Sequence, residues 1–402
     1  MPLQLGSITS LLHWAPHKQH DESAVAHIRC LPVCKGGRQA IGEDTVKRLM
    51  IDVDQLGAQA SPNCQQAQDL MHEKMRRQLS DDVQKQLHHV LEVIKELTAE
   101  KGGRACQKHT PHEAVELLEQ FVALDLPVQL LAEIPLLCFE ARKDVMNVCC
   151  ALLWPGMPQH VDRQMVQYLQ HHPRAFPVLV AGYEHEETAL HCGVVLRSFA
   201  RHAELVEAFL GSRLVFNLLR LTRHPGVDIS SDAFYTLREM LLCHKEVSAR
   251  WLQENFQDFF SLYNEMLRTQ DYFQQRQALD LLASMLLDRS FKPVMLAYVK
   301  DARHLKINMN LLRDSSKVVR FEAFQVFKIF AADPQKPRPV HQILYQNRDR
   351  LVELLRELEA FGTDDVKERF STDQRAVVGK LQALQAPPAP AQAAARRPAP
   401  GA

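Results

Sequence analysis

The residue types best suited to hold a metal ion gather near the start of the chain. His20, His27, Cys30 and Cys34 lie close together, and imidazole and thiolate groups are the usual protein ligands of Zn²⁺. A structural zinc site, however, ordinarily pairs closely spaced cysteines with a second regular pair of cysteines or histidines. Here the histidines are irregularly spaced and no second cysteine pair follows. We therefore predict no metal site.

Two other segments have only a superficial likeness to catalytic motifs. The run EHEETALH, Glu184 to His191, contains two histidines six positions apart, whereas the zinc-protease motif needs histidines that share one helix face. Lys101 to Arg104 holds a lone glycine pair without a preceding strand or a Gly-Lys-Ser/Thr ending, which is typical of a turn. No Ser/His/Asp or Cys/His set is recognisable, so we expect neither enzymatic activity nor a cofactor.

Charge and hydropathy limit the other function classes. The 402 residues include 48 Lys and Arg against 48 Asp and Glu, so no global positive field favours nucleic acid or anionic membrane. The most apolar later run, Val122 to Cys138, is interrupted by charged residues and prolines, and the first residues lack the basic start of a signal peptide. Several cysteines sit among apolar residues, as buried free thiols do. We expect a cytoplasmic protein with no nucleic-acid partner and no membrane insertion.

The elements that must position any functional group are helices. From about residue 80, apolar residues recur at spacings of three and four, and no stretch alternates with period two. Four segments share a template in which a small residue is followed by bulky apolar residues four and seven positions later. These are Cys192/Leu196/Phe199, Ala233/Leu237/Met240, Ala278/Leu282/Met285 and Ala323/Phe327/Phe330, with a weaker copy at Val145/Cys149/Leu152.

The template residues recur at intervals of 41, 45 and 45 positions. A period of this length, with one strongly apolar helix per unit, predicts an all-α armadillo- or HEAT-like helical-repeat solenoid. Asp and Ser in the tripeptides ending at Asp271 and Ser316 are suitable N-caps for two of these helices. A helical bundle without repeats is the alternative.

The ends of the chain differ from the body in composition. Residues 1–78 read as a divergent N-terminal extension, partly disordered, and residues 79–385 as the armadillo-like domain. Within that domain, Pro339 to Phe361 is predicted to form the first helix of a closing pair. Residues 386–402 are rich in Pro and Ala, which favours a disordered, solvated tail.

One stretch has a local excess of positive charge. Between Arg303 and Lys328 there are six Lys or Arg against two acids. We expect Lys317, Arg320 and Lys328 to lie outside the core or at the edge of a groove. Such charge is often only a solvated face, but solenoids align successive helices into extended binding surfaces. A site for a peptide or another domain is therefore a hypothesis for this stretch.

The chain from Asp81 to Leu384 resembles the calcium-binding protein 39, or mouse protein twenty-five, family. The matching stretches are GYEHEETALHCGVVLRSFARH, DISSDAFYTLREMLLCHKEVSARWLQENFQDFFSLYNEML, DYFQQRQALDLLASMLLDR and LKINMNLLRDSSKVVRFEAFQVFKIFAADPQKP. The resemblance implies a noncatalytic scaffold that binds Sterile-twenty-family kinases or a related pseudokinase and stabilises their active conformation. No Asp-x-Asp-x-Asp-Gly calcium motif is present.

The resemblance also implies two binding surfaces. One is a pocket for a C-terminal Trp-Glu-Phe tail, with Arg276, Lys306 and Met309 at the matching positions. The flexible Met side chain can pack against aromatic rings, and Arg or Lys can form an ion pair with a carboxylate. Alternatively, Met309 belongs to the core and Arg276 is a solvated helix residue. The other surface is a concave face that grips the kinase, where the matching residues are Tyr272, Arg289 and Phe291.

Three positions depart from the family pattern. Val227 stands where the family has an aromatic residue, Asp280 replaces a lysine, and Lys292 replaces a phenylalanine, so that Phe291 is displaced by one. Reversal of a charge at an interface turns attraction into repulsion. These departures favour an alternative function, a helical-repeat adaptor that binds peptides of polarity or cytoskeletal proteins without activating a kinase.

Overall fold

The computed structural model describes residues 48–53, 55, 66–98, 110–155, 157 and 161–386, and the regular elements among them are all helices. The described residues fall into two compact units. We call residues up to Leu262 the first unit and residues from Tyr263 the second unit, with α15 (Phe256–Leu267) containing the boundary. The predicted all-α class is confirmed.

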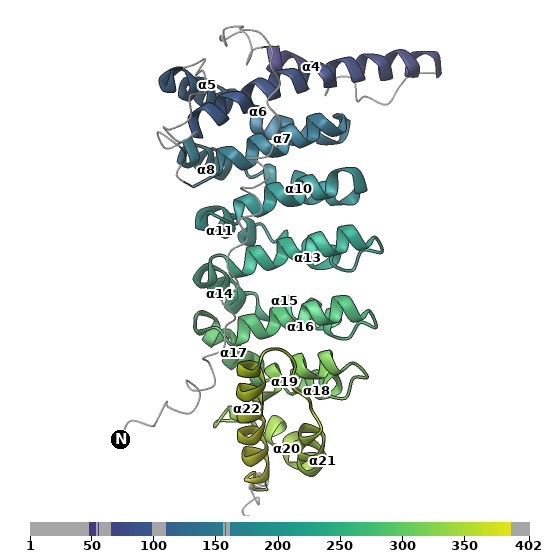
Figure 1. Cartoon of the computed structure of the whole chain (residues 1–402), viewed down its shortest axis with the longest axis vertical. Helices are drawn as coiled ribbons and strands as arrows, with labels where there is room; N and C mark the ends of the chain where they lie inside the picture. The colour runs from purple at the N-terminus through teal and green to yellow at the C-terminus, as the bar shows by residue number, and fades with distance from the viewer. Residues whose placement is uncertain are drawn as a thin grey trace, which may run out of the picture. The chain divides into compact units, whose positions relative to one another are not determined.

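In the first unit, helices follow one another in triplets after the long α4 (Gln66–Thr98) (Figure 1). The triplets are α5 (Pro111–Ala123), α6 (Leu126–Glu133) and α7 (Phe139–Leu152); α8 (Val161–His171), α9 (Ala175–Ala181) and α10 (Glu186–Phe199); and α11 (Ala203–Gly211), α12 (Val215–Leu221) and α13 (Val227–Leu242). The short helices η1 (Ile134–Leu136) and η3 (Gly182–Glu184) lie before α7 and α10, and α14 (Lys245–Glu254) follows α13.

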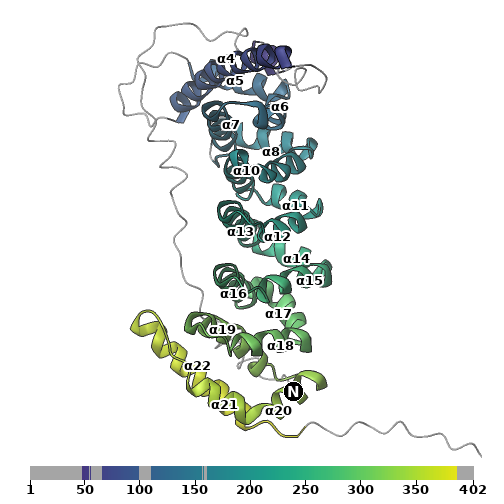
Figure 2. The ribbon, with the colours of Figure 1, turned by 90° about the vertical axis from the view of Figure 1, so that its right-hand side faces the viewer.

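Helices at the same position in successive triplets pack on one another. The last helices α7, α10 and α13 form one stack below α4, and the first helices α5, α8, α11 and α14 form a second stack beside it (Figure 2). A unit of three helices that packs only on its neighbours is the armadillo arrangement. The predicted helical-repeat solenoid is therefore confirmed.

The second unit continues the same element order. It contains α16 (Tyr272–Leu286), η4 (Arg289–Phe291), α17 (Lys292–Val299), α18 (Ala302–Leu311), α19 (Lys317–Ala332), α20 (Arg338–Gln346), α21 (Arg348–Arg356) and α22 (Asp364–Gln382). Here α16 packs on α19, and α19 packs on α22. We refer to α7, α10, α13, α16 and α19 as the third helices.

The sequence template marks the core of each third helix. All template residues, including the weaker copy in α7, are at most 2% exposed. Residues spaced by four and three positions share one helix face, so each third helix buries the predicted stripe.

In the second unit, the same kind of hydrogen bond reaches the small template residue of two third helices. The hydroxyl of Tyr263 donates to the carbonyl of Ala278 at 2.7 Å, and the side-chain amide of Asn308 donates to the carbonyl of Ala323 at 3.2 Å. Both donors stand 15 positions before a small template residue. The small residue therefore leaves its own carbonyl accessible to the preceding helices.

Helix starts agree with the predicted caps in the second unit. The Asp271 carboxylate accepts from the amide of Gln274 at 2.9 Å, and the Ser316 hydroxyl accepts from that of Val319 at 3.4 Å. Such N-cap bonds satisfy amides that the helix itself leaves unpaired. In contrast, α10 and α13 begin without a side-chain cap bond.

Two predictions about the ends need correction. Pro339 to Phe361 contains two helices, because α20 ends at Gln346 and α21 begins at Arg348. The expected boundary after residue 78 falls inside α4. Most of residues 1–78 and all of residues 387–402 lie outside the described residues.

Candidate functional site

Each third helix has an outer face opposite its buried template. At 3.6 residues per turn, positions six and two before the small template residue, and two and five after it, lie on the helix face opposite the template. We call these residues the outer ridge. They are Phe139, Lys143, Asn147 and Cys150 in α7; Glu186, Leu190, Val194 and Arg197 in α10; Val227, Ser231, Tyr235 and Arg238 in α13; Tyr272, Arg276, Asp280 and Ala283 in α16; and Lys317, Phe321, Gln325 and Lys328 in α19.

The outer ridge exposes apolar side chains that a core would normally bury. In the first unit, Phe139 is 61% exposed, Leu190 48%, Val227 71% and Tyr235 46%. In the second unit, Tyr272 is 47% exposed. Of the eight large hydrophobic residues exposed among the described residues, these five lie on the ridge. Exposed apolar groups that recur on one face of successive helices, as these four do in the first unit, mark protein-binding surfaces.

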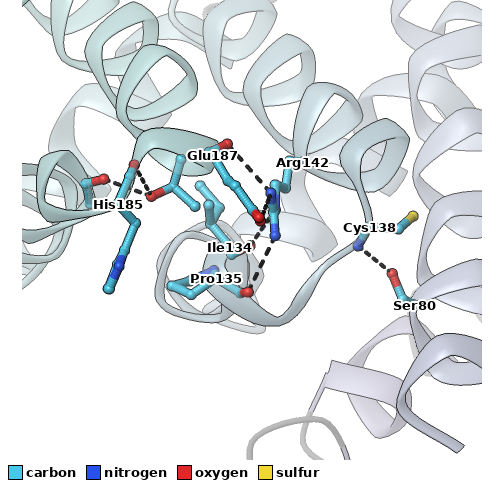
Figure 3. Close-up of polar contacts among 9 residues, drawn as sticks. Ser80, Ile134, Pro135, Cys138, Arg142, His185 and Glu187 are labelled. Carbon is cyan, nitrogen blue, oxygen red and sulfur yellow. Dashed lines mark hydrogen bonds and ion pairs between the residues drawn. The ribbon is translucent and has the colours of Figure 1, made fainter. Parts of the chain in front are cut away.

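Arg142 fixes the starts of two neighbouring third helices (Figure 3). Its guanidinium donates to the carbonyl of Ile134 at 3.1 Å and to that of Pro135 at 3.4 Å, at the end of the preceding helices. It also forms an ion pair with the carboxylate of Glu187 at 2.9 Å, while its own side chain is only 11% exposed. One buried cation thus links α7 to the first turn of α10.

A second contact holds the first residue of the α7 ridge. Cys138, the N-cap of α7, has no side-chain cap bond, but its backbone N–H donates to the hydroxyl of Ser80 on α4 at 2.7 Å (Figure 3). Phe139 follows directly, and its ring meets the His191 ring edge-on at 5.7 Å. Burial, and then the charge of Arg142, lowers the pKa of His191. Burial thus disfavours the charged form of the imidazole that contacts the Phe139 ring.

A polar network supports Tyr235 from below. The Arg197 guanidinium pairs with the Asp232 carboxylate at 2.9 Å and donates to the Thr236 hydroxyl at 2.7 Å. The hydroxyl of Tyr183 donates to the same carboxylate at 2.7 Å. The Arg197 guanidinium carbon lies 4.8 Å from the centre of the Tyr235 ring, a cation–π contact. The Tyr235 ring is therefore exposed to solvent while the hydrogen-bonded Arg197 side chain holds it in place.

In the second unit, the predicted residues of α16 follow the outer ridge. Tyr272 and Arg276 are exposed one turn apart, and Asp280 is half-buried one turn further on. Spacings of four positions place all three side chains on one face. A partner lying along α16 would therefore meet an aromatic ring, a cation and an anion in that order.

The predicted tail-binding residues lie on two helices. Arg276 is exposed on α16, whereas Lys306 is exposed and Met309 half-buried on α18. Lys306 and Met309 are three positions apart and share a helix face. The main packing neighbours of α16 are α17 and α19, and those of α18 are α17, α19 and α20. The two parts of the predicted pocket thus belong to helices joined through α17 and α19.

The predicted kinase-facing residues near η4 divide into exposed and buried side chains. Arg289 and Lys292 are exposed, but Phe291 is 0% exposed. The prediction that Phe291 faces a partner is therefore wrong. Its ring is part of the core, because η4 turns the residue after Ser290 inward at the start of α17.

Lys328 is also buried, contrary to the prediction that it lies outside or at a groove edge. It is 1% exposed and donates to Asp373 of α22 and to Gln325, each at 2.8 Å. The Phe370 ring of α22 stacks on Phe321 at a centroid distance of 5.2 Å. Since α22 covers the ridge of α19, the open outer ridge of the second unit lies on α16.

Residue-by-residue reading of the sequence missed the ridge of the first unit. Phe139, Leu190 and Tyr235 were not singled out, although the repeat template contains the necessary signal. Phe139 and Val227 precede their small template residues by the same six positions as Tyr272 does. Extension of the template to its solvent-facing positions would have found them.

Two other classes of site are not found in the described part of the chain. No group of three or more His, Cys, Asp or Glu side chains could hold a metal ion there. None of the described helices combines the length and hydropathy needed to cross a bilayer. His20, His27, Cys30 and Cys34, the weak zinc candidates, lie outside the described residues.

Comparison with known proteins identifies relatives along most of the chain. The family model described as Mo25-like matches residues 45–385. The "Mo25-like protein" of Schizosaccharomyces pombe is 36% identical over 305 residues, which cover 75% of this chain and 91% of the relative. The human "Calcium-binding protein 39-like" is 34% identical over 280 residues, which cover 69% of this chain and 82% of the relative.

Designed proteins are among the solved structures that align with this chain. A designed armadillo repeat protein in complex with a (KR)4 peptide aligns with 70% of this chain and 99% of its own, at 12% identity and a TM-score of 0.38. The family match and the identities to full-length relatives agree with the predicted resemblance. On these matches, the chain belongs to the Mo25-like family.

Proposed function

We propose that the chain is a noncatalytic cytoplasmic scaffold that binds protein kinases of the Sterile-twenty family, or a related pseudokinase–kinase complex, and stabilises their active conformation. The observation that carries this proposal is the outer ridge. Within the first unit, Phe139, Leu190 and Val227 expose apolar side chains on successive third helices, and a folded partner that spans these repeats would bury them together. Rigid aromatic anchors beside arginine are the usual hot spots of such interfaces.

Tail docking by the second unit supports the same proposal. Arg276 and Lys306 are exposed cations, and half-buried Met309 offers an adaptable apolar wall. A Trp-Glu-Phe tail carries two aromatic rings, a glutamate and a terminal carboxylate, which match these groups in kind. The cations would pair with the carboxylates while Met309 contacts a ring.

The first test measures tail binding directly. A fluorescent peptide ending in Trp-Glu-Phe is titrated with the wild-type chain and followed by polarisation. We expect saturable binding that weakens at least tenfold in Arg276→Ala and in Met309→Ala. Arg313→Ala, which removes an exposed arginine beyond α18, serves as the matched control. Equal affinity for all four proteins, or no binding by a folded wild type, would contradict tail docking.

The second test measures kinase regulation. A purified Sterile-twenty-family kinase domain is assayed with and without the chain, and activity should rise when the chain is added. Tyr272→Ala and Arg289→Ala should reduce this effect, since both side chains are exposed on the proposed surface. Lys300→Ala, another exposed residue of the second unit, should leave it unchanged. An unaffected kinase would sink the activation proposal.

A peptide-binding adaptor without kinase activation is the second candidate. Val227 is 71% exposed but has no aromatic ring, and Asp280 adds a negative charge to the outer ridge of α16. Both features weaken contacts that a kinase lobe would use. Affinity purification distinguishes the candidates by whether recovered partners contain kinase domains. Under the kinase proposal, Asp280→Lys should strengthen the interaction, whereas under the adaptor proposal it should weaken or not alter binding.

A further inference from the structure

The first unit contains a cavity that is not part of the outer ridge. It has a volume of about 260 Å³ and lies between α6, α9 and the helical residues 48–53. Its lining residues are Val53, Val128, Gln129, Ala132, Glu133, Arg174 and Val178. Pockets for drug-sized molecules and cofactors occupy about 300–1,000 Å³. This cavity is therefore sized for one side chain.

The walls of the cavity suit an unbranched alkyl chain. Val53, Val128, Ala132 and Val178 are among its lining residues, and they come from three separate segments. Methylene groups gain free energy when they leave water for such a lining. An occupant with a straight aliphatic stem would cover these methyl groups without needing a polar partner along its length.

Two hydrogen-bond acceptors of the cavity lack donors. The Gln129 side-chain oxygen is buried and accepts no hydrogen bond, which costs free energy unless a donor arrives. The Glu133 carboxylate is half-buried and has no hydrogen bond or ion pair with any described residue. Burial raises its pKa. Both groups would be satisfied by one occupant that donates several hydrogen bonds and carries positive charge.

Among the described lining residues, the one cation, Arg174, already has a carboxylate partner. The Arg174 guanidinium forms an ion pair with Asp125, whose carboxylate also accepts from the hydroxyl of Tyr168. His172 lies 3.6 Å from the same carboxylate. The uncompensated charge at the cavity is therefore the negative charge of Glu133.

We propose that this cavity binds the side chain of one lysine or arginine presented by an extended segment of another protein. The aliphatic stem lies against the three valines, and the ammonium or guanidinium group donates to Gln129 and pairs with Glu133. The single-side-chain volume favours a residue of a peptide over a larger ligand. The proposal is independent of the kinase-scaffold function, because α6 and α9 contribute nothing to the outer ridge.

The valine methyl groups provide a direct test. The full chain, labelled at Leu and Val methyls, is titrated with acetyl-Gly-Lys-Gly-amide and followed by methyl NMR. We expect saturable shifts at Val53, Val128 and Val178. The same peptide with norleucine in place of lysine keeps the stem and removes the charge, so it should bind at least tenfold more weakly. n-Butylamine, which has the stem and charge but no peptide, should also bind more weakly.

Variants of the acceptor groups complete the test. Glu133→Gln should weaken lysine-peptide binding at least tenfold, and Gln129→Leu should weaken it severalfold. Glu204→Gln, at an exposed carboxylate on α11 of the same unit, should bind as the wild type does. The proposal is overturned if the methyls do not shift, if norleucine binds equally well, or if Glu133→Gln has no effect. Butylamine binding as tight as the peptide would make this a site for free amines and overturn peptide docking.

Discussion

Asp144 illustrates how one buried carboxylate sets a pH dependence. Its side chain is 8% exposed on α7, and burial raises its pKa from 3.8 to about 6, against the opposing charge of His88. The folded chain therefore holds this proton more tightly than the unfolded chain. The resulting contribution to stability is complete below about pH 4 and is lost as the pH rises to about 6.

Asp144→Asn tests this dependence. The amide is neutral at every pH, so the variant avoids the cost of a buried negative charge. We expect its Tm to exceed that of the wild type at pH 7 and the two to converge near pH 4, as measured by thermal unfolding followed by circular dichroism. Glu204→Gln, at an exposed carboxylate on α11, is the control. An equal difference at both pH values would contradict the assignment.

The absence of a side chain at Gly193 leaves space for the Arg197 network. A Cβ atom there would lie 1.9 Å from a carboxylate oxygen of Asp232 and 2.5 Å from the hydroxyl of Tyr183. Gly193→Ala should therefore lower the free energy of unfolding by roughly 1–3 kcal/mol, as overpacking does. Gly379→Ala is the matched control in a helix, since no atom lies within 4 Å of its added Cβ. Urea unfolding should show the control unchanged or stabilised, and a neutral Gly193→Ala would contradict the close packing.

Individual side chains were harder to predict than their helices. Lys328 was placed on the surface because lysine is rarely buried, but its partner Asp373 lies 45 positions later on α22. Phe291 was placed on the surface by resemblance, yet the turn of η4 buries it. Such burial depends on partners distant in sequence, which no local pattern contains.

At the scale of elements, Arg142 acts as a clamp between repeats. Arg142→Met keeps much of the side-chain volume but leaves the carbonyls of Ile134 and Pro135 without this donor and Glu187 without its ion pair. We expect faster amide hydrogen exchange in η1 and in the first turn of α10, because local opening costs less when these bonds are missing. Lys143→Met, at the neighbouring position, should leave exchange unchanged. Equal protection in both variants would show that Arg142 does not hold the two elements.

The elements themselves differed in how well the sequence predicted them. The third helices carry a full apolar stripe with a regular period, so they were found with their core residues. In contrast, α9 and α12 contain only seven residues each, which is too short for a periodic pattern to stand out. The break between α20 and α21 was missed because no Gly or Pro marks it; Asn347 separates them.

At the scale of the whole molecule, stability should be distributed along the repeats. Each repeat packs mainly on its neighbours, so a local defect should weaken nearby repeats most. Two of the three tryptophans, Trp154 and Trp251, lie in the first unit, and Trp14 lies outside the described residues. Tryptophan fluorescence therefore reports mainly on the first unit, whereas circular dichroism reports on all helices.

Asp373→Ala tests this distribution of stability, because fluorescence and circular dichroism report on different parts of the chain. Loss of the carboxylate leaves the buried Lys328 without its ion pair. Breaking a fully buried pair costs about 3–5 kcal/mol, and the loss here is smaller because the Asp373 side chain is 21% exposed. We expect the urea midpoint measured by circular dichroism to fall more than the midpoint measured by fluorescence. Lys328→Met in the same background should restore much of the loss, because it removes the unpaired charge. Glu359→Ala, which breaks the exposed pair with Lys317, should alter neither midpoint, and equal shifts in Asp373→Ala would indicate a single cooperative unit.

Because α22 packs over α19, loss of α22 by truncation should have a genetic effect. A premature stop codon before Asp364 would remove Phe370 and Asp373, so that Phe321 would lose a stacking partner and Lys328 its counter-ion. Exposed aromatic surface of this kind is what cellular quality control degrades. Alleles truncated just before α22 should therefore behave as loss of the whole protein, even though most of the proposed binding surface is still encoded.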